Sequence, residues 1–387
     1  MKKWKMKYGC ILFFTFYVLL IGCQIKDKAE TAIIVKEEEP IDNDLTSKAL
    51  EYADSLLTIM TLEERVGQCL MPSIYSSSDS STIRLLKKYI EDYHVGGIVL
   101  MQGNLASAKK IAKIGEEAKI PLFISIDAEW GLGMRLVDAP VYPKNGNLGK
   151  EAEESELYDY GREIAQECNL IGINMVLGPV VDLSNSKRGV LGNRSYGENP
   201  RLVSDLGVAY SKGLESGGVI SVAKHFPGHG STQMDSHKGT VKITRDITAL
   251  DSMDLKPFKE YINSGLTGIM AGHIKAQALD PDGNPASVSI DMLTSLLREE
   301  MGFKGLILTD AFDMGGAKGF SGAAALKAGA DLILCPSNIA KEYQELLTVV
   351  NNGSLDIKIV NERCRRILFV KYLFNICPQY HKRAESA

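Results

Sequence analysis

The sequence lacks any marked excess of charge of one sign. Its 387 residues include 44 lysines and arginines against 48 aspartates and glutamates, which gives a formal net charge of -4. The basic residues are scattered along the chain, so the charge gives no reason to expect nucleic acid as a partner. With 45% hydrophobic residues, the chain has ample material for a packed globular core.

The sequence also lacks the short motifs that bind metal ions, dinucleotides or nucleotide phosphates. It has no Cys-x-x-Cys metal pattern, and no G-x-G-x-x-G or Walker sequence precedes a helical segment. Five of its seven cysteines lie beyond the N-terminal segment, widely spaced in mostly apolar surroundings: Cys69, Cys168, Cys335, Cys364 and Cys377. We interpret them as buried small hydrophobic residues rather than a disulfide framework.

The N-terminus differs from the rest of the chain. Four lysines within the first seven residues precede a short apolar run, Ile11–Ile21, and Gly22-Cys23 follows at once. This pattern predicts an export signal over residues 1–22, because the run is too short for a comfortable membrane span. Leu20 to Cys23 resembles the bacterial lipoprotein processing box, which implies lipidation of the Cys23 thiol. We therefore expect an exported bacterial lipoprotein, anchored at the periplasmic side of a membrane or at the cell surface.

The remaining organisation follows from composition. Residues 23–43 are polar and charged and predict a flexible tether. Residues 44–377 are expected to form one domain, and residues 378–387 a disordered tail. Residues 46–60 have helix-compatible apolar spacing, and Thr61, followed by Glu63 and Glu64, predicts a helix N-cap with an acidic first turn.

Apolar runs alternate with helix-like segments along this domain. Eight runs recur, at 66–71, 95–100, 122–126, 175–181, 219–223, 268–271, 305–308 and 332–334. Helices are expected at 82–93, 105–118, 151–171, 201–216, 250–264, 290–301, 321–329, 340–351 and 357–374. Near-continuous hydrophobicity indicates parallel strands buried on both faces. The pattern predicts an α/β protein with a single (β/α)8 TIM-like barrel, and an open doubly wound sheet is the alternative.

Polar residues follow most of these runs, at the strand ends that carry catalytic groups in such barrels. They are Asp127, Glu129, Trp130 and Arg135; Asp182, Arg188, Asn193, Arg194 and Ser195; Lys224 and His225; His273; Thr309 and Asp310; and Cys335, Pro336 and Ser337. So many charges at one end of a barrel favour a site for a polar ligand, because burying unpaired charges is costly. For any single residue, a salt bridge that closes the barrel mouth is the alternative.

The loop after the fifth run concentrates histidine. Three of the six histidines, His225, His229 and His237, lie within thirteen positions, and Asp235 stands two positions before the last. Proline and glycine between them exclude a continuing strand or helix, so this stretch is expected to be a functional loop. We expect it to move during function, since a loop-borne group can swing over bound substrate.

Three segments of the sequence, including this loop, resemble those of a known enzyme family. KHFPGHGSTQMDSH (224–237), with IDAEWGLGMR (126–135) and LILTDAFDMGG (306–316), resembles the bacterial β-N-acetylhexosaminidases of glycoside hydrolase family 3 over about Leu56 to Pro336. The resemblance implies that Asp310 is the nucleophile, that His237 is the acid/base, and that Asp235 is the partner of His237. It also implies the sugar-holding residues Asp127, Arg135, Arg194, Lys224 and His225.

The chemistry of the residues agrees with that assignment. A retaining glycosidase needs a carboxylate near the anomeric carbon and a proton donor for the leaving oxygen. Asp310 directly follows a strand that can aim it, and we prefer it to Asp313, which lies further from that strand. Histidine can act as the donor because its pKa lies near neutral pH and a carboxylate such as Asp235 can orient it.

The chain departs from common family members at Asp127-Ala128-Glu129-Trp130-Gly131, where many have Asp-Gln-Glu-Gly-Gly. Trp130 either stacks on a sugar face or packs beneath the loop. His273 is taken as a further substrate contact, and His229 as a support for the loop. From the sequence we expect no second α/β domain after the predicted barrel, unlike in many family 3 β-glucosidases.

We therefore expect a monomeric enzyme without metal or organic cofactor that removes terminal N-acetylglucosamine from oligosaccharides or peptidoglycan fragments. The alternatives are a family 3 β-glucosidase or a phosphorylase that transfers the sugar to phosphate. A different class is a metal-dependent barrel hydrolase using His225, His229, His237, His273 and an aspartate. A noncatalytic sugar-binding lipoprotein is the last alternative.

Overall fold

A computed structural model of the chain describes residues 43–184, 191–229 and 241–377. The first half of this part contains α1 (Asn43–Ile59), α2 (Leu62–Gln68), β1 (Leu70–Met71), β2 (Ser73–Ser76), α3 (Ser80–Glu91), β3 (Gly97–Gly103), α4 (Leu105–Glu116), β4 (Phe123–Ile126), η1 (Leu132–Met134), α5 (Asn145–Glu151), α6 (Glu154–Ile171), β5 (Met175–Val176), η2 (Gly192–Arg194) and α7 (Pro200–Ser216). From α2 onward, helical segments thus separate most strands, as the spacing of apolar runs predicts, although β2 directly follows β1 and α6 directly follows α5.

The second half continues the alternation. It contains β6 (Ile220–Phe226), β7 (Val241–Ile243), α8 (Ile247–Ala249), η3 (Leu250–Asp254), α9 (Lys256–Asn263), β8 (Gly268–Ala271), β9 (Ile274–Ala276), η4 (Ala286–Val288), η5 (Asp291–Glu300), β10 (Leu306–Thr309), η6 (Gly315–Ala317), α10 (Gly322–Ala328), β11 (Ile333–Leu334), α11 (Ile339–Asn351) and α12 (Ile357–Leu373). Both η3 and η5 are π-helical, where the sequence predicted ordinary helix.

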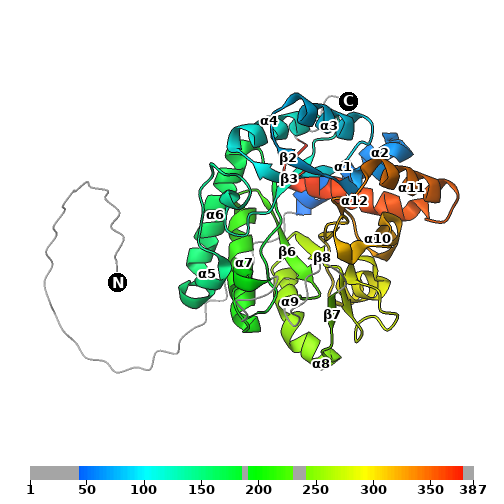
Figure 1. The fold of residues 1–387 in the computed structure, drawn as a ribbon. Coiled ribbons are helices and arrows are strands. Elements are labelled where there is room, and N and C mark those ends of the chain that lie inside the picture. Colours follow the sequence, from blue (N-terminus) through cyan, green and yellow to red (C-terminus); the bar gives the residue numbers. More distant parts are fainter. Residues whose placement is uncertain (1–42, 185–190, 230–240, 378–387) are drawn as a thin grey trace, which may run out of the picture. The chain divides into compact units, whose positions relative to one another are not determined.

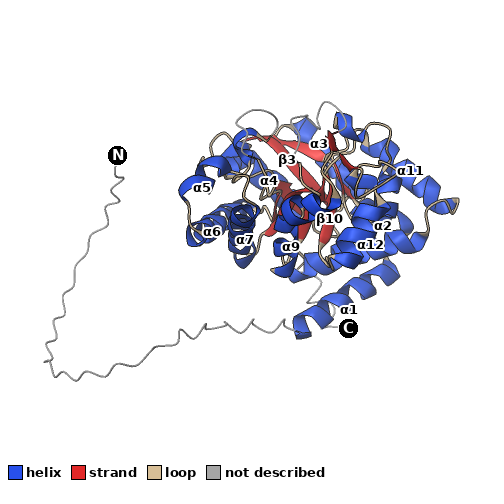
Figure 2. Ribbon diagram, turned by 90° about the horizontal axis from the view of Figure 1, so that it is seen from below, coloured by secondary structure: helices blue, strands red, loops and turns tan. Residues whose placement is uncertain are grey.

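The central feature is a curled parallel sheet. Seven strands pair in the order β10-β8-β6-β5-β4-β3-β2, and every neighbouring pair is parallel. A separate parallel pair, β1-β11, is linked to β10 by a bridge between Leu308 and Leu332. Helices surround the strands (Figure 1, Figure 2). Every residue of β4, β8 and β10 is buried, as expected for parallel strands covered on both sides.

Two predicted strands are shorter in the structure. The run at 66–71 is helical up to Gln68, and only Leu70–Met71 belongs to a strand. Thr61 and Glu64 explain the helix: Thr61 Oγ1 accepts from Glu64 N at 3.3 Å, and Glu64 Oε2 accepts from Thr61 N at 3.0 Å. The run at 175–181 is a regular strand only over Met175–Val176, and Pro179, which has no N–H to donate, lies within the remainder.

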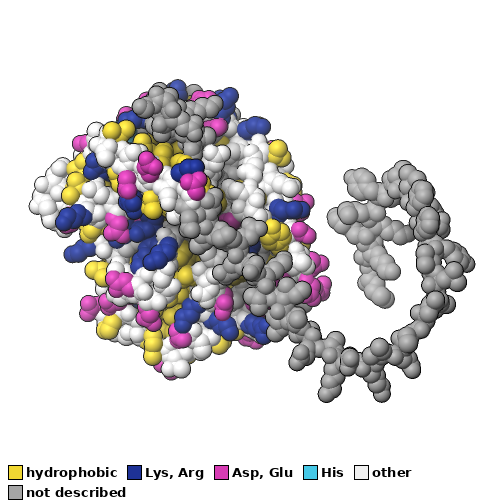
Figure 3. Space-filling view, turned by 180° about the vertical axis from the view of Figure 1, so that it is seen from behind, with side chains coloured by type: hydrophobic (Ala, Val, Ile, Leu, Met, Phe, Trp, Pro, Cys, Tyr) yellow, Lys and Arg dark blue, Asp and Glu magenta, His cyan; other side chains and the backbone are white. Residues whose placement is uncertain are grey.

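On the face drawn in Figure 3, acidic and basic side chains of the described residues lie among neutral ones. Among the described residues, no helix has the length and apolar character that crossing a membrane requires. The cysteines Cys69, Cys168, Cys335, Cys364 and Cys377 are free and buried, which confirms their interpretation as core residues.

Candidate active site

A cavity of about 470 Å³ opens at the carboxyl ends of the strands. Asp127 directly follows β4, Lys224 and His225 lie in the last part of β6, and Asp310 directly follows β10. The charged and histidine residues that line this cavity are Asp127, Glu129, Arg135, Arg194, Lys224, His225, His229, Asp310 and Asp313. The parallel sheet therefore brings polar groups from separate strand ends to one place, as the sequence predicted.

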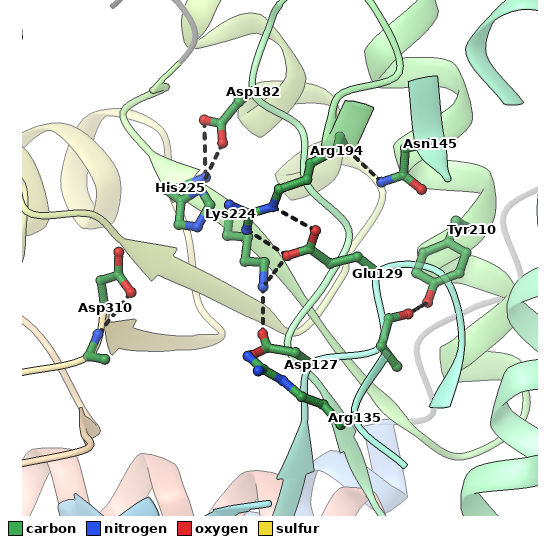
Figure 4. Close-up of polar contacts among 12 residues, drawn as sticks. Asp127, Glu129, Arg135, Asn145, Asp182, Arg194, Tyr210, Lys224, His225 and Asp310 are labelled. Atoms are coloured by element: carbon green, nitrogen blue, oxygen red, sulfur yellow. Dashed lines mark hydrogen bonds and ion pairs between the residues drawn. The ribbon is translucent and has the colours of Figure 1, made fainter. Parts of the chain in front are cut away.

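An alternating row of charges forms one wall of the cavity (Figure 4). Lys224 Nζ donates to Asp127 Oδ1 at 2.8 Å and lies 2.9 Å from Glu129 Oε1. Arg135 pairs with the other oxygen of Asp127. Arg194 donates from Nε to Glu129 Oε2 at 2.8 Å and from Nη2 to Glu129 Oε1 at 2.6 Å. Each acid thus contacts two cations and shares Lys224 with the other acid, so each position in the row is fixed by its neighbours.

The pairing keeps both acids ionised in a buried setting. Burial by itself would raise the pKa of Asp127, but the charges of Lys224 and Arg135 outweigh it and hold that pKa well below its usual range. Burial likewise opposes ionisation of Glu129, and Lys224 and Arg194 lower its pKa to about 2. Such a set presents fixed hydrogen-bond donors and acceptors to a polar ligand.

Asp182 orients the two histidines of the β6 end. Its Oδ2 lies 2.7 Å from His225 Nδ1, while its Oδ1 accepts from the backbone N–H of His225 at 3.2 Å and of His229 at 2.6 Å. Burial works to raise the pKa of Asp182, but these contacts outweigh it and lower the pKa below its ordinary value. An ionised Asp182 accepts from Nδ1–H, so any lone pair of the His225 ring lies on Nε2.

Asp310 presents a carboxylate to the cavity. Its backbone N–H donates to Ala271 O at 2.8 Å, and its Oδ1 accepts from Ala311 N at 2.8 Å. Burial favours the neutral acid, but His225, His273 and the Ala311 N–H favour the anion more strongly, so the pKa of Asp310 is lowered. An ionised, backbone-fixed carboxylate is what nucleophilic attack requires. Asp313 lines the same cavity but is exposed.

The structure gives His273 a different position from the expected substrate contact. Its ring is fully buried, with Nδ1 2.7 Å from Ser287 Oγ and Nε2 3.0 Å from Ala311 O, and it is not among the residues that line the cavity. The sequence showed only that His273 follows a strand. It did not show that β9 starts one residue later and that this ring contacts the backbone oxygen of Ala311.

Trp130 and His229 both line the cavity. Lys144 Nζ lies 4.7 Å from the centroid of the Trp130 ring, so one face of that ring is covered by an ammonium group. His229, expected to support the loop, is 2% exposed and contributes to the cavity wall. Whether it supports the loop stays a prediction.

Asn145 is a supporting residue that sequence reasoning missed. It is fully buried, and its Nδ2 donates to the backbone oxygen of Arg194 at 2.8 Å. Nothing in its sequence surroundings signals this role, because 145 and 194 are brought together only by the fold. Ser195 is structural as well: its Oγ donates to Asp182 O at 2.6 Å.

Several predicted residues lie outside the described part of the chain, namely Cys23, Arg188, Asp235 and His237. Within the described ranges, no group of three or more His, Cys, Asp or Glu side chains is arranged to hold a metal ion.

Comparison with known proteins gives a consistent result. Residues 61–370 match the glycosyl hydrolase family 3 N terminal domain. The chain is 34% identical over 282 residues to "Beta-hexosaminidase A" of Pseudoalteromonas piscicida, covering 65% of this chain and 47% of that protein. It is 33% identical over 270 residues to "Beta-hexosaminidase" of Nitrosomonas eutropha, covering 66% of this chain and 77% of that protein.

Solved structures agree at the level of the fold. A family 3 β-N-acetylglucosaminidase from Paenibacillus sp. str. FPU-7 has a TM-score of 0.75 at 32% identity, over 82% of this chain and 63% of that one. The chain thus spans about half the length of the first relative and under two thirds of this solved chain. The match to the family model over most of the chain confirms the predicted family: the chain belongs to glycosyl hydrolase family 3, of which it contains the N-terminal domain.

Proposed function

We propose that the protein is a retaining exo-glycosidase that removes terminal β-linked N-acetylglucosamine, or another N-acetylhexosamine, from oligosaccharides or peptidoglycan fragments. The observation that carries this proposal is the Asp310 carboxylate, whose pKa is lowered and which faces one cavity with the charged row of Asp127, Lys224 and Glu129. The relatives named beta-hexosaminidase support the choice of an N-acetylhexosamine.

In this mechanism Asp310 attacks the anomeric carbon. A bond forms between a carboxylate oxygen and that carbon while the bond to the leaving oxygen breaks, and the leaving oxygen takes a proton. Water then cleaves the glycosyl-enzyme ester. We assign the proton donor to His237, oriented by Asp235; both lie outside the described residues, and the support for them is the 224–237 motif.

The charged row is suited to hold the sugar. Hydroxyl groups both donate and accept hydrogen bonds, and the alternating cations and carboxylates of the row offer both kinds of partner. We propose that Asp127, Arg135, Arg194, Lys224 and His225 bind the sugar, with Trp130 beside them at the cavity wall.

The direct test is hydrolysis of 4-nitrophenyl N-acetyl-β-glucosaminide, with the product anomer followed by NMR. We expect turnover with first release of the β anomer, a loss of about 1000-fold or more for Asp310→Asn, and a strong loss for His237→Ala. The exposed Asp313→Asn variant is the matched control and should keep activity within about 10-fold. Equal losses in the two aspartate variants, or wild-type turnover by His237→Ala, would overturn the assignments. Release of sugar 1-phosphate only when phosphate is present would indicate a phosphorylase instead.

We also propose that the curled sheet closes as a (β/α)8 barrel. The β1-β11 pair and the Leu308–Leu332 bridge support this, because together they connect β10 with the strand that precedes β2. A crystal structure with solvent between β10 and β11 would contradict it.

Export and lipidation at Cys23 form a separate proposal, supported by the basic start, the apolar run Ile11–Ile21 and the processing-box resemblance. Cell fractionation and mass spectrometry of the mature N-terminus test it. The wild type should carry a diacylglyceryl group on Cys23 and fractionate with membranes, whereas Cys23→Ser should not. An unmodified Cys23 would refute the proposal.

A further inference from the structure

His229 is a buried histidine whose ring nitrogens have no hydrogen-bond partner among the described residues. Its side chain lines the cavity, it is 2% exposed, and within the described part of the chain neither Nδ1 nor Nε2 has a partner. Its position is nevertheless fixed, since its backbone N–H donates to Asp182 Oδ1 at 2.6 Å. The ring stands 6.1 Å from that of His225, centroid to centroid, at an interplanar angle of 63°.

The neighbouring histidines differ from it. His225 Nδ1 is held by Asp182, and both ring nitrogens of His273 contact protein oxygens. Native proteins leave few buried polar groups unpaired, because such a group loses its contacts with water and gains nothing in return. A polar ring that lines a cavity and has no partner among the described residues therefore indicates a ligand that completes its hydrogen bonds.

The charge state defines what such a ligand must offer. Burial lowers the pKa of His229, more strongly than the charge of Asp182 raises it, so the ring is neutral near neutral pH. A neutral imidazole has one N–H donor and one acceptor lone pair. An anion could use only the donor, whereas an amide or a hydroxyl group can pair with either nitrogen.

We propose that His229 is a substrate-binding residue whose ring hydrogen-bonds a sugar substituent near the carbon that Asp310 attacks. This inference rests on the proposed function, because Asp310 defines where that carbon lies. His229 and Asp310 line the same cavity, and the charge of Asp310 acts on His229. The substituent is an acetamido or a hydroxyl group of the sugar.

A His229→Phe variant separates binding from support of the fold. Phenylalanine keeps a ring of similar size but removes the unpaired nitrogens, so the midpoint of thermal unfolding should rise by about 1–3 °C. The kcat/KM for 4-nitrophenyl N-acetyl-β-glucosaminide should fall roughly 10- to 100-fold. His229→Gln retains a donor and an acceptor and should recover part of that loss. A residue that only supports the loop would give a lowered midpoint in the Phe variant, and this result overturns the proposal.

His273→Phe is the matched control, because it removes a buried histidine outside the cavity lining whose nitrogens are paired. Its unfolding midpoint should fall. Isothermal titration calorimetry identifies which sugar substituent His229 contacts. The affinities of the wild type and of His229→Phe are measured for N-acetylglucosamine and for glucose. A loss of affinity in His229→Phe for N-acetylglucosamine only indicates the acetamido group, and equal losses indicate a hydroxyl group. Unchanged affinity for both sugars overturns the proposal. These binding data need no turnover, so they remain decisive even if the proposed hydrolysis fails.

Discussion

Glu129 holds Arg194 in a two-pronged ion pair, with Arg194 Nε 2.8 Å from Glu129 Oε2 and Nη2 2.6 Å from Oε1. Glu129 is 1% exposed, and its Oε1 also lies 2.9 Å from Lys224 Nζ. One carboxylate therefore fixes two cations that come from different segments of the chain, η2 and β6. Its contribution is to aim those cations at the cavity.

Glu129→Gln should weaken both the fold and catalysis. The amide occupies the same space but removes the charged partner of Arg194 and leaves Lys224 paired with Asp127 alone. Breaking a buried pair typically costs about 3–5 kcal/mol, so we expect the free energy of unfolding to fall by about 3 kcal/mol. A small misplacement of binding groups costs about 100-fold in rate, so we expect kcat/KM to fall on that order.

Urea unfolding and steady-state kinetics measure the two effects. The control is Glu91→Gln, at an exposed position at the end of α3, which should change neither quantity. If Glu129→Gln retained full kcat/KM while losing stability, the pair would serve the fold alone.

Glu215 makes stability depend on pH. Its Oε1 accepts from Ser221 Oγ at 2.7 Å and from Thr267 N at 3.0 Å, and its Oε2 accepts from Thr267 Oγ1 at 2.9 Å. Burial outweighs these bonds and raises its pKa from 4.5 to about 7. The folded protein therefore keeps this proton between pH 4.5 and 7 while the unfolded chain has lost it.

Glu215 stabilises the folded protein less as the pH rises. Across that window the contribution of Glu215 to stability falls as pH rises, by roughly 3 kcal/mol in total, and it is constant above the window. Glu215→Gln cannot ionise, so the variant should gain stability relative to the wild type by about that amount between pH 4.5 and 8. Urea unfolding at several pH values measures the difference. Parallel profiles for the two proteins would show that Glu215 does not titrate in this window.

The ends of the strands were predictable from the sequence because each strand is a continuous apolar run. Their clustering was predictable because the carboxyl ends of parallel strands lie at one edge of the sheet. That argument brought together Asp127, Lys224 and Asp310 from segments far apart in the sequence, and the cavity contains all three. Side-chain direction was not predictable in the same way. His273 also follows a strand, yet the turn into β9 places its ring outside the cavity lining.

Apolar runs alone also could not show where a helix cap overrides a predicted strand. Val66 and Gly67 continue an apolar stretch into β1, but the Thr61–Glu64 capping box directs them into α2. His229 lay in a motif that was recognised, but its exceptional feature is the lack of partners for both ring nitrogens among the described residues. Only the three-dimensional arrangement can show that.

His273 should act by positioning Asp310. Its ring joins Ser287 Oγ to Ala311 O, the backbone oxygen directly after the carboxylate residue. His273→Ala removes both bonds and leaves a cavity, so we expect a loss of about 2–4 kcal/mol in the free energy of unfolding. The kcat should fall more than KM rises, because the ring lies outside the cavity lining.

Ser287→Ala is the matched variant, because it removes one of the two contacts and should cause a smaller change in the same direction. Unchanged stability together with a raised KM in His273→Ala would restore the substrate contact that the sequence suggested.

Trp130 should contribute to substrate affinity through its ring. Trp130 lines the cavity, and Lys144 Nζ, 4.7 Å from the ring centroid, covers one face of its ring. We expect the other face to stack on the sugar. Stacking on an aromatic face is worth about 1 kcal/mol, so Trp130→Ala should raise KM about 5-fold with kcat nearly unchanged. Lys144→Met keeps the ring but removes the ammonium group, so it should leave KM within about 2-fold. If Trp130→Ala instead lowered stability and left KM unchanged, the ring would pack beneath its loop, which was the alternative interpretation of this residue.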